Sequence, residues 1–310
     1  MLTLYRWAMA FQNSHFSLAY DRPSITMVSQ PEIPFDRKSM PGHRTYFETL
    51  CRVVSLALEV LRSRMYPEAQ EPRYHEIREY KQRIQRMLAE ATPHLRHRDQ
   101  CRSLAEHIER TELRLHSSYL LSVLCRVSLD RHAHLDEQRR ALIREDCISS
   151  LISTIDAFAE LHEINSHCSR SWISLQRSIA SAFLLVANND SPQTWDLLDR
   201  LEKALADHVY ADGDAEHNNR TDSAKHLSSS LRALREIREA FRARKPKPTP
   251  PVPVSGPTTY SLDTTPALPP NMVTAGGPIL PMEDWGMRNI LGRVSDVMLF
   301  PSMSGASPIV

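Results

Sequence analysis

"RTYFETLCRVVSLALEVLRSRM", residues 44 to 65, is the stretch that decides the fold class. Its apolar residues recur three and four positions apart, which is the spacing of one face of an α-helix. Pro41 and Gly42 form a break just before it. A helix of this kind buries its apolar stripe against other helices, so we expect a fold of packed helices. The apolar positions are Leu50, Val53, Val54, Ala57, Leu58 and Leu61.

Helical patterns continue on both sides of this stretch. Pro93 is expected to end one helix, Asp136 to cap another, and Pro192 to occupy the first turn of a third. The only β-like run, residues 24–28, is short and lies between prolines. We therefore predict an all-α, multi-helix, bundle-like domain over residues 1–244. Its expected helices cover residues 4–20, 44–65, 75–91, 99–129, 136–158, 172–186, 192–209 and 224–244, with Leu104, Ile108, Leu115, Tyr119, Leu120 and Leu142 among the core positions.

The composition changes at Lys245. Residues 245–281 hold 11 of the 21 prolines, so we expect residues 245–282 to form an extended or disordered linker. Residues 283–310 form a short C-terminal tail with an amphipathic helical pattern that includes Trp285 and Leu291. Two roles stay open for this tail, which are docking on the helical domain and recruitment of a partner.

The 310 residues carry a formal net charge of +1. This balance argues against a protein that coats nucleic acid or an anionic membrane with its whole surface. No run approaches the ~18 apolar residues of a membrane span, and we read no signal peptide at the N-terminus. The five cysteines are odd in number and have no metal-ligand spacing, so we expect reduced, buried thiols in an intracellular protein.

Two further stretches are distinctive. In "AYDRPSITMV", residues 19 to 28, Arg22 suits the negative end of a helix and Pro23 prevents the helix from continuing. "SRSWISLQRSIASAFLLV", residues 169 to 186, is apolar nearly all round, as expected for a central, buried helix. Its small residues allow close approach of neighbouring helices. Core packing is the favoured interpretation of this helix, and a ligand pocket beside it is the alternative.

Together these stretches resemble the middle regulatory domain of fungal zinc-cluster transcription factors. That family has a Gly/Asp-Arg-Pro element after a helix, and later a Trp followed by His-Asn and a run ending in leucines. Gln176 and Arg177 stand here in place of His-Asn, and the stretch at residues 227–238 is similar to the family's closing helix. The resemblance covers about residues 1–244. The residues that carry it are Asp21, Arg22, Pro23, Trp172, Leu184 and Leu185.

The resemblance implies a transcription regulator of the nucleus that acts through its regulatory domain and controls a metabolic or specialised-metabolite gene cluster. Its partners would be other transcription regulators or a co-activator, and a homo- or heterodimer is compatible with this role. The family reads DNA through an N-terminal six-cysteine cluster with two zinc ions, and this sequence has no such pattern. We therefore expect either a domain that is incomplete at its N-terminus or contact with DNA only through others. No cofactor is expected in this chain.

Two other functions are compatible with an all-α chain. One is an adaptor or inhibitor that has no DNA contact of its own and pairs with a full-length regulator. The other is an all-α enzyme, which is disfavoured because the sequence has no paired carboxylates, phosphate-binding loop or nucleophile with its base. We therefore expect that the protein is not an enzyme and that it does not act at a membrane.

Two histidine groups could suggest a metal site. His132 and His134 are two positions apart, so their rings would point apart on a helix. For His162, His167 and Cys168, a helix end with a buried thiol is the preferred interpretation.

Two further patterns point weakly to chemistry. Asn219 and Ser223 have the spacing of the magnesium motif of terpene cyclases, but Leu227 occupies the place of its glutamate. Cys125 and Cys147 lie in apolar helical settings that raise the pKa of a thiol, so we expect small core residues rather than nucleophiles.

A basic cluster ends the last expected helix. Arg242, Arg244, Lys245 and Lys247 form a possible nuclear-import signal beside the linker. The alternative is a solvated helix face whose cations complement the negative helix end.

Overall fold

The computed structural model describes residues 2–20, 32–33, 39–64, 74–130, 135–189, 191–213 and 222–244. Over these ranges the chain is helical and has no strand, and the only β-type pairing is a single parallel bridge between Arg44 and Ala91. The all-α prediction is therefore confirmed. The predicted extended run at residues 24–28, the Pro-rich linker at 245–282 and the tail at 283–310 lie outside the described residues.

Each predicted helical range overlaps an α-helix of the structure, and the short α4 is an addition to them. Three short 3-10 turns, η2 (Arg98–Gln100), η3 (Arg126–Leu129) and η4 (Cys168–Arg170), lie between the helices of the described ranges. The α-helices are α1 (Leu2–Tyr20), α2 (Tyr46–Arg64), α3 (Tyr74–Ala89), α4 (Pro93–Arg96), α5 (Leu104–Cys125), α6 (Glu137–Ile164), α7 (Trp172–Asn188), α8 (Pro192–Gly213) and α9 (Asp222–Arg244).

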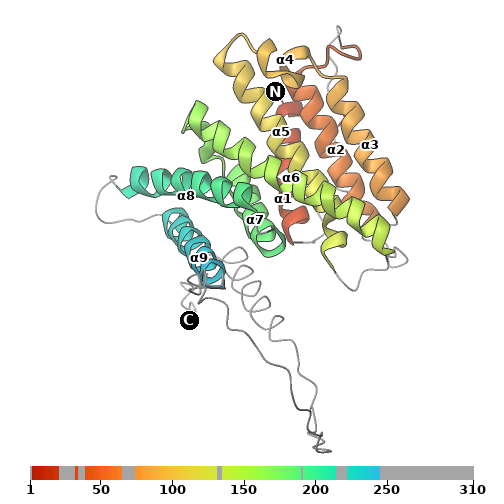
Figure 1. The fold of residues 1–310 in the computed structure, drawn as a ribbon. Coiled ribbons are helices and arrows are strands. Elements are labelled where there is room, and N and C mark those ends of the chain that lie inside the picture. The colour runs from red at the N-terminus through yellow and green to blue at the C-terminus, as the bar shows by residue number, and fades with distance from the viewer. Residues whose placement is uncertain are drawn as a thin grey trace, which may run out of the picture.

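Helix α6 joins the two halves of the domain (Figure 1). On one side, α1, α2, α3 and α5 pack together, and the short α4 lies at the end of this group. On the other side, α7 and α8 pack on α6, and α9 packs on α8. None of the helices described here is long and apolar enough to cross a membrane.

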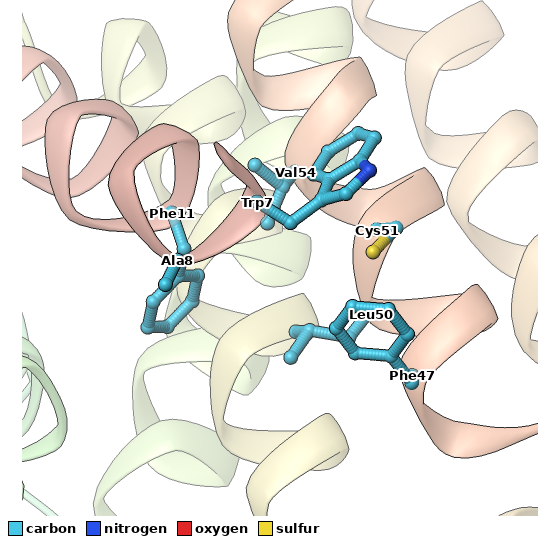
Figure 2. A pocket seen from close by; sticks show the side chains of 7 residues that line it. All are labelled: Trp7, Ala8, Phe11, Phe47, Leu50, Cys51 and Val54. Atoms are coloured by element: carbon cyan, nitrogen blue, oxygen red, sulfur yellow. The ribbon is translucent and has the colours of Figure 1, made fainter. Parts of the chain in front are cut away.

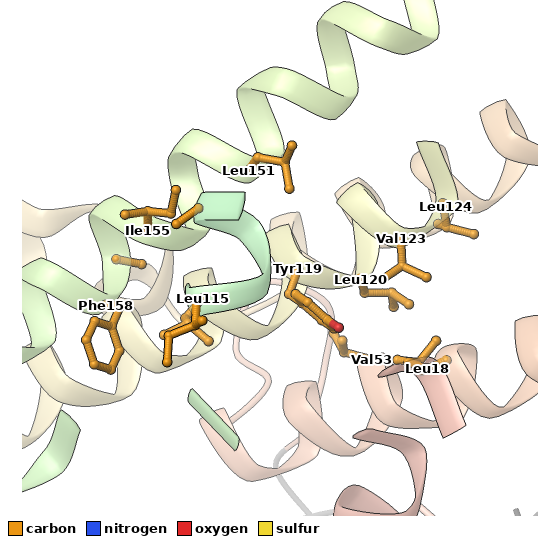
Figure 3. Close-up of a cluster of buried hydrophobic side chains, with 14 of the residues drawn as sticks. Leu18, Val53, Leu115, Tyr119, Leu120, Val123, Leu124, Leu151, Ile155 and Phe158 are labelled. Carbon is orange, nitrogen blue, oxygen red and sulfur yellow. The ribbon is translucent and has the colours of Figure 1, made fainter. Parts of the chain in front are cut away.

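The core is densest where α5 faces α6 (Figure 3). Tyr119 of α5 and Phe158 of α6 are among the largest fully buried side chains of the described chain. Complete burial of an apolar side chain of this size contributes about 1.5–3 kcal/mol. Contacts of this kind explain why α5 and α6 form the centre of the fold. Labelled in the figure are also Leu18, Val53, Leu115, Leu120, Val123, Leu124, Leu151 and Ile155.

Side-chain caps set the starts of the two central helices. The predicted cap of α6 is confirmed, because Asp136 Oδ1 accepts a hydrogen bond from the Arg139 backbone N–H at 2.9 Å. The predicted start of α5 at residue 99 is wrong. Ser103 has extended backbone and its hydroxyl accepts from the Glu106 N–H at 3.2 Å, so α5 starts at Leu104.

Two leucines predicted for the core are on the surface. Leu104 is the first residue of α5, where the core no longer covers it, and its exposed fraction is 56%. Leu142 of α6 is 50% exposed, because the adjacent Ile143 takes the buried position at that turn. The other predicted apolar positions of α6 are buried or pack against the core.

The start of α2 is attached to the end of α3. Gly42 has a φ of 88°, a conformation that residues with a side chain rarely adopt, and its N–H donates to the Glu90 carbonyl at 2.8 Å. The Thr92 N–H donates in turn to the Arg44 carbonyl at 2.9 Å. Helix α3 ends at Ala89, before Pro93, as predicted. Pro93 itself opens the short helix α4, because the first turn of a helix needs no N–H from it.

Candidate functional site

An apolar pocket of about 110 Å³ lies between α1 and α2 (Figure 2). Its position follows from the packing of α1 across α2, which leaves space between their larger side chains. The Trp7 indole N–H donates to the Glu32 carbonyl at 2.9 Å, which fixes the ring at one wall. Helix α1 contributes Trp7, Ala8 and Phe11 to the lining, and α2 contributes Phe47, Leu50, Cys51 and Val54.

A second, smaller cavity shares part of this lining. Phe11, Leu50 and Val54 line both spaces, and the smaller one extends to His116 of α5 and Arg177 of α7. Its volume is about 10 Å³, close to the least that holds one water molecule. The apolar pocket therefore borders a polar centre inside the domain.

Arg177 is the charged residue of this centre, and its exposed fraction is 4%. The guanidinium carbon lies 4.9 Å from the ring centroid of Tyr119 and 5.3 Å from that of Phe11. Nη1 donates to His116 Nδ1 at 2.7 Å, whereas Nε has no hydrogen-bond partner. No ion pair joins Arg177 to a carboxylate among the described residues. Burial lowers the pKa of Arg177 to about 10, so the group keeps its positive charge at neutral pH.

Two neutral imidazoles accompany this cation. Burial, followed by the charge of Arg177, lowers the pKa of His15 to about 3. The same two effects lower the pKa of His116 well below its ordinary value, and its Nδ1 accepts the hydrogen bond from Arg177. At neutral pH these three side chains therefore contribute one positive charge to the interior.

The elements that build this centre are far apart in the sequence. Helix α7 is buried on nearly every side, so a long side chain at position 177 has no route to solvent and enters the space between α1 and α5. In the sequence, Gln176 and Arg177 stand out only as departures from a family pattern. A single arginine inside a helix that is otherwise apolar or small is the signal that could have found this site.

The residues that carry the family resemblance divide into two groups. Trp172 is half-buried at the first position of α7, Leu184 is half-buried, and Leu185 is fully buried in the core. Asp21, Arg22 and Pro23 lie outside the described residues, directly after the last residue of α1. Helix α7 itself is central and buried, as its sequence pattern predicts.

A polar cluster lies between α6, η4 and α8. The Ser169 hydroxyl lies 3.0 Å from His162 Nδ1 and 2.9 Å from His208 Nε2, and it donates to the Ser166 carbonyl. His162 Nε2 is 3.1 Å from Asp207 Oδ2. These contacts bring together the three groups of a Ser-His-Asp set. Because Ser169 is fully buried, its hydroxyl has no open path to a substrate. The cluster fixes η4 between the two helices.

The structure does not bring the predicted histidine and cysteine groups together as ligands. His167 is exposed, and Cys168 is half-buried without a hydrogen bond to His162. Within the described ranges, no group of His, Cys, Asp and Glu side chains could hold a metal ion. His132 and His134 lie outside these ranges.

The remaining candidate residues lie on α5, α6 and α9 or outside the described ranges. Cys125 and Cys147 are buried, and burial raises the pKa of both thiols, that of Cys147 to about 11. This direction is the predicted one. Leu227 is buried, whereas Asn219 lies outside the described residues and the side chain of Ser223 is not described.

Two arginines of α9 that precede the basic cluster pair with carboxylates of α8. Arg235 Nε lies 2.6 Å from Glu202 Oε1, and Arg238 pairs with Glu202 at 2.9 Å and with Asp199, all across to α8. Of the predicted import residues, Arg242 and Arg244 belong to the last turns of α9, but their side chains are not described. Lys245 and Lys247 follow outside the described ranges.

Comparison with known proteins gives no match to a family model, to a curated protein or to a solved structure.

Proposed function

We propose that the chain is the regulatory domain of a nuclear transcription regulator that resembles the fungal zinc-cluster factors. Helix α7 carries this proposal. It holds Trp172 at its start and the Leu184–Leu185 pair near its end, and it is buried on nearly all sides. A change in the packing of such a helix shifts the helices that surround it. This coupling is what a domain that transmits a signal requires.

The proposed domain is a scaffold rather than a reader of DNA. It controls an associated DNA-binding module by contact with other transcription regulators or a co-activator, and its targets are genes of a metabolic or specialised-metabolite cluster. Arg242, Arg244, Lys245 and Lys247 serve as the import signal, because these four cations form a short basic stretch in the sequence.

The test is a reporter assay in yeast with the chain fused to an unrelated DNA-binding domain. The fusion should raise or lower the reporter relative to that DNA-binding domain alone. Leu185→Asp places a charge in the core and should abolish the effect, whereas Leu142→Asp alters an exposed leucine and should preserve it. A wild-type fusion that reaches the nucleus but leaves the reporter unchanged contradicts the proposal.

A second candidate function is an adaptor or inhibitor that pairs with a full-length regulator. The observation that favours it is the outer face of α1, where Tyr5 is 64% exposed and Met9 is 60% exposed. An untethered chain should then compete with the tethered chain and reverse its effect on the reporter. The double variant Tyr5→Glu, Met9→Glu should no longer compete. Competition that persists in this variant excludes the α1 face as the pairing surface.

A further inference from the structure

We propose that the apolar pocket between α1 and α2 and the smaller cavity beside Arg177 form one binding site for a small carboxylic acid with an apolar body. The body is one aromatic ring or a short alkyl chain, and the carboxylate pairs with Arg177. This inference goes beyond the proposed role in transcription and does not depend on it.

The buried charge is the first argument. A guanidinium removed from water is costly unless an anion or several hydrogen-bond acceptors compensate it. Arg177 has the neutral His116 as its hydrogen-bond acceptor and two aromatic rings as its other contacts, while its Nε–H has no acceptor. A carboxylate oxygen is the acceptor that a guanidinium N–H binds best, and the pair would neutralise the interior.

The size and lining of the pocket are the second argument. Its volume of about 110 Å³ is somewhat below that of a ~150 Å³ protein cavity that takes up benzene. Burial raises the pKa of Cys51 to about 12, so its thiol is neutral and the lining carries no charge. The space therefore fits the apolar body of a ligand and not a second ionised group.

The shared wall is the third argument. Phe11 lines the apolar pocket and the smaller cavity, and its ring also lies next to the guanidinium of Arg177. A ligand that packs on Phe11 therefore contacts the same ring that lies beside the guanidinium of Arg177. The smaller cavity holds about one water-sized atom, which admits one carboxylate oxygen but excludes a phosphate group with its several oxygens.

The test is calorimetric titration of the full chain with benzoate, phenylacetate and 3-phenylpropionate, each against its uncharged amide. At least one acid should bind one site with a Kd between about 10 µM and 1 mM. Its amide should bind at least about tenfold more weakly, because it lacks the charge-assisted bond. Equal binding of acid and amide, or no saturable binding of any acid, overturns the proposal.

Three variants locate the binding. Arg177→Met keeps the bulk and removes the charge, and it should weaken the acid at least about tenfold while the amide is unaffected. The matched control is Arg126→Met, since Arg126 also lies over Tyr119, at 5.4 Å, but does not line either cavity. Ala8 is exposed at the mouth of the pocket, so Ala8→Trp should block acid and amide alike without disturbing the fold.

These variants also give the contrary results. Unchanged acid binding in Arg177→Met, or equal losses in Arg177→Met and Arg126→Met, shows that the cation at position 177 is not the partner. If circular dichroism shows that Arg177→Met does not fold, the Ala8→Trp variant alone tests the location of the site. Acid binding that persists in Ala8→Trp then overturns the proposed site.

Discussion

Glu160→Ala should destabilise the domain far more than the same change three residues later on α6. The Glu160 carboxylate is buried at the contact of α5 and α6. Its Oε1 accepts from Arg110 Nη2 at 2.5 Å and its Oε2 from Arg114 Nη2 at 2.6 Å. Arg114 keeps Asp156 at 2.9 Å, but no other carboxylate in the described chain pairs with Arg110, whose side chain is itself buried.

The loss of stability in Glu160→Ala follows from the buried charge of Arg110, which is left without a carboxylate partner among the described residues. Removal of one partner of a buried ion pair costs about 3–5 kcal/mol. For a domain of this size, the melting temperature should then fall by about 6–20 °C. Glu163→Ala is the matched control, because Glu163 is 60% exposed and pairs with Arg200 at 3.0 Å on the surface. An exposed pair contributes about 0–1 kcal/mol, so the control should barely change stability.

The assay is urea unfolding of both variants and the wild type, followed by circular dichroism at constant pH and salt. The expected result is a large drop in the transition midpoint for Glu160→Ala with an unchanged slope, and almost none for Glu163→Ala. Equal, small losses in the two variants would refute the idea that Glu160 holds α5 to α6 through Arg110.

Acid should destabilise the domain below pH 6.5, because the unfolded chain protonates His15 at its ordinary pKa of 6.5 while the folded pKa is lowered to about 3. Stability should fall by about 2 kcal/mol between pH 6.5 and 5 through His15 alone, and unfolding curves of His15→Gln should lack this part of the slope. Ser169→Ala should cost about 1–3 kcal/mol, since nitrogens of His162 and His208 lose their partner; an unchanged melt would contradict the described cluster. Gly42→Ala should cost about 1 kcal/mol in thermal melts because of its φ of 88°, although no atom within 4 Å crowds the added methyl group.

The helices of this fold could be predicted because their signals are local. The apolar residues of α2 recur with the helical period, and Val53, Ala57 and Leu58 are all buried. Asp136 caps α6 with a bond to a residue only three positions away. Such interactions depend on neighbours in the sequence, so the sequence alone reveals them.

The start of α5 could not be placed from the same signals. The pattern around Asp99 suits a helix, but Arg98–Gln100 forms a separate 3-10 turn and Cys101 is extended. Ser103, and not Asp99, caps the N-terminus of α5. Leu104 is therefore the first residue of the helix, where the core does not cover it. Boundaries of this kind depend on which of several possible caps the surrounding fold can accommodate.

The candidate site was beyond sequence reasoning for a related reason. Phe11, His116 and Arg177 come from α1, α5 and α7, and only the packing of these helices decides that they meet. The pattern of α7 predicts its burial correctly, yet it does not say what surrounds its one arginine. Likewise, Ser169 and His208 form a cluster with His162 through contacts between distant segments.

Acute depletion of the protein in cells that express it tests the central claim most directly. The chain is tagged for induced degradation, and newly made RNA is sequenced before secondary responses develop. A regulator of transcription predicts a prompt change in a limited set of genes, which a re-expressed wild-type chain restores and a Leu185→Asp chain does not. Complete loss of the protein with no change in newly made transcripts would contradict the account.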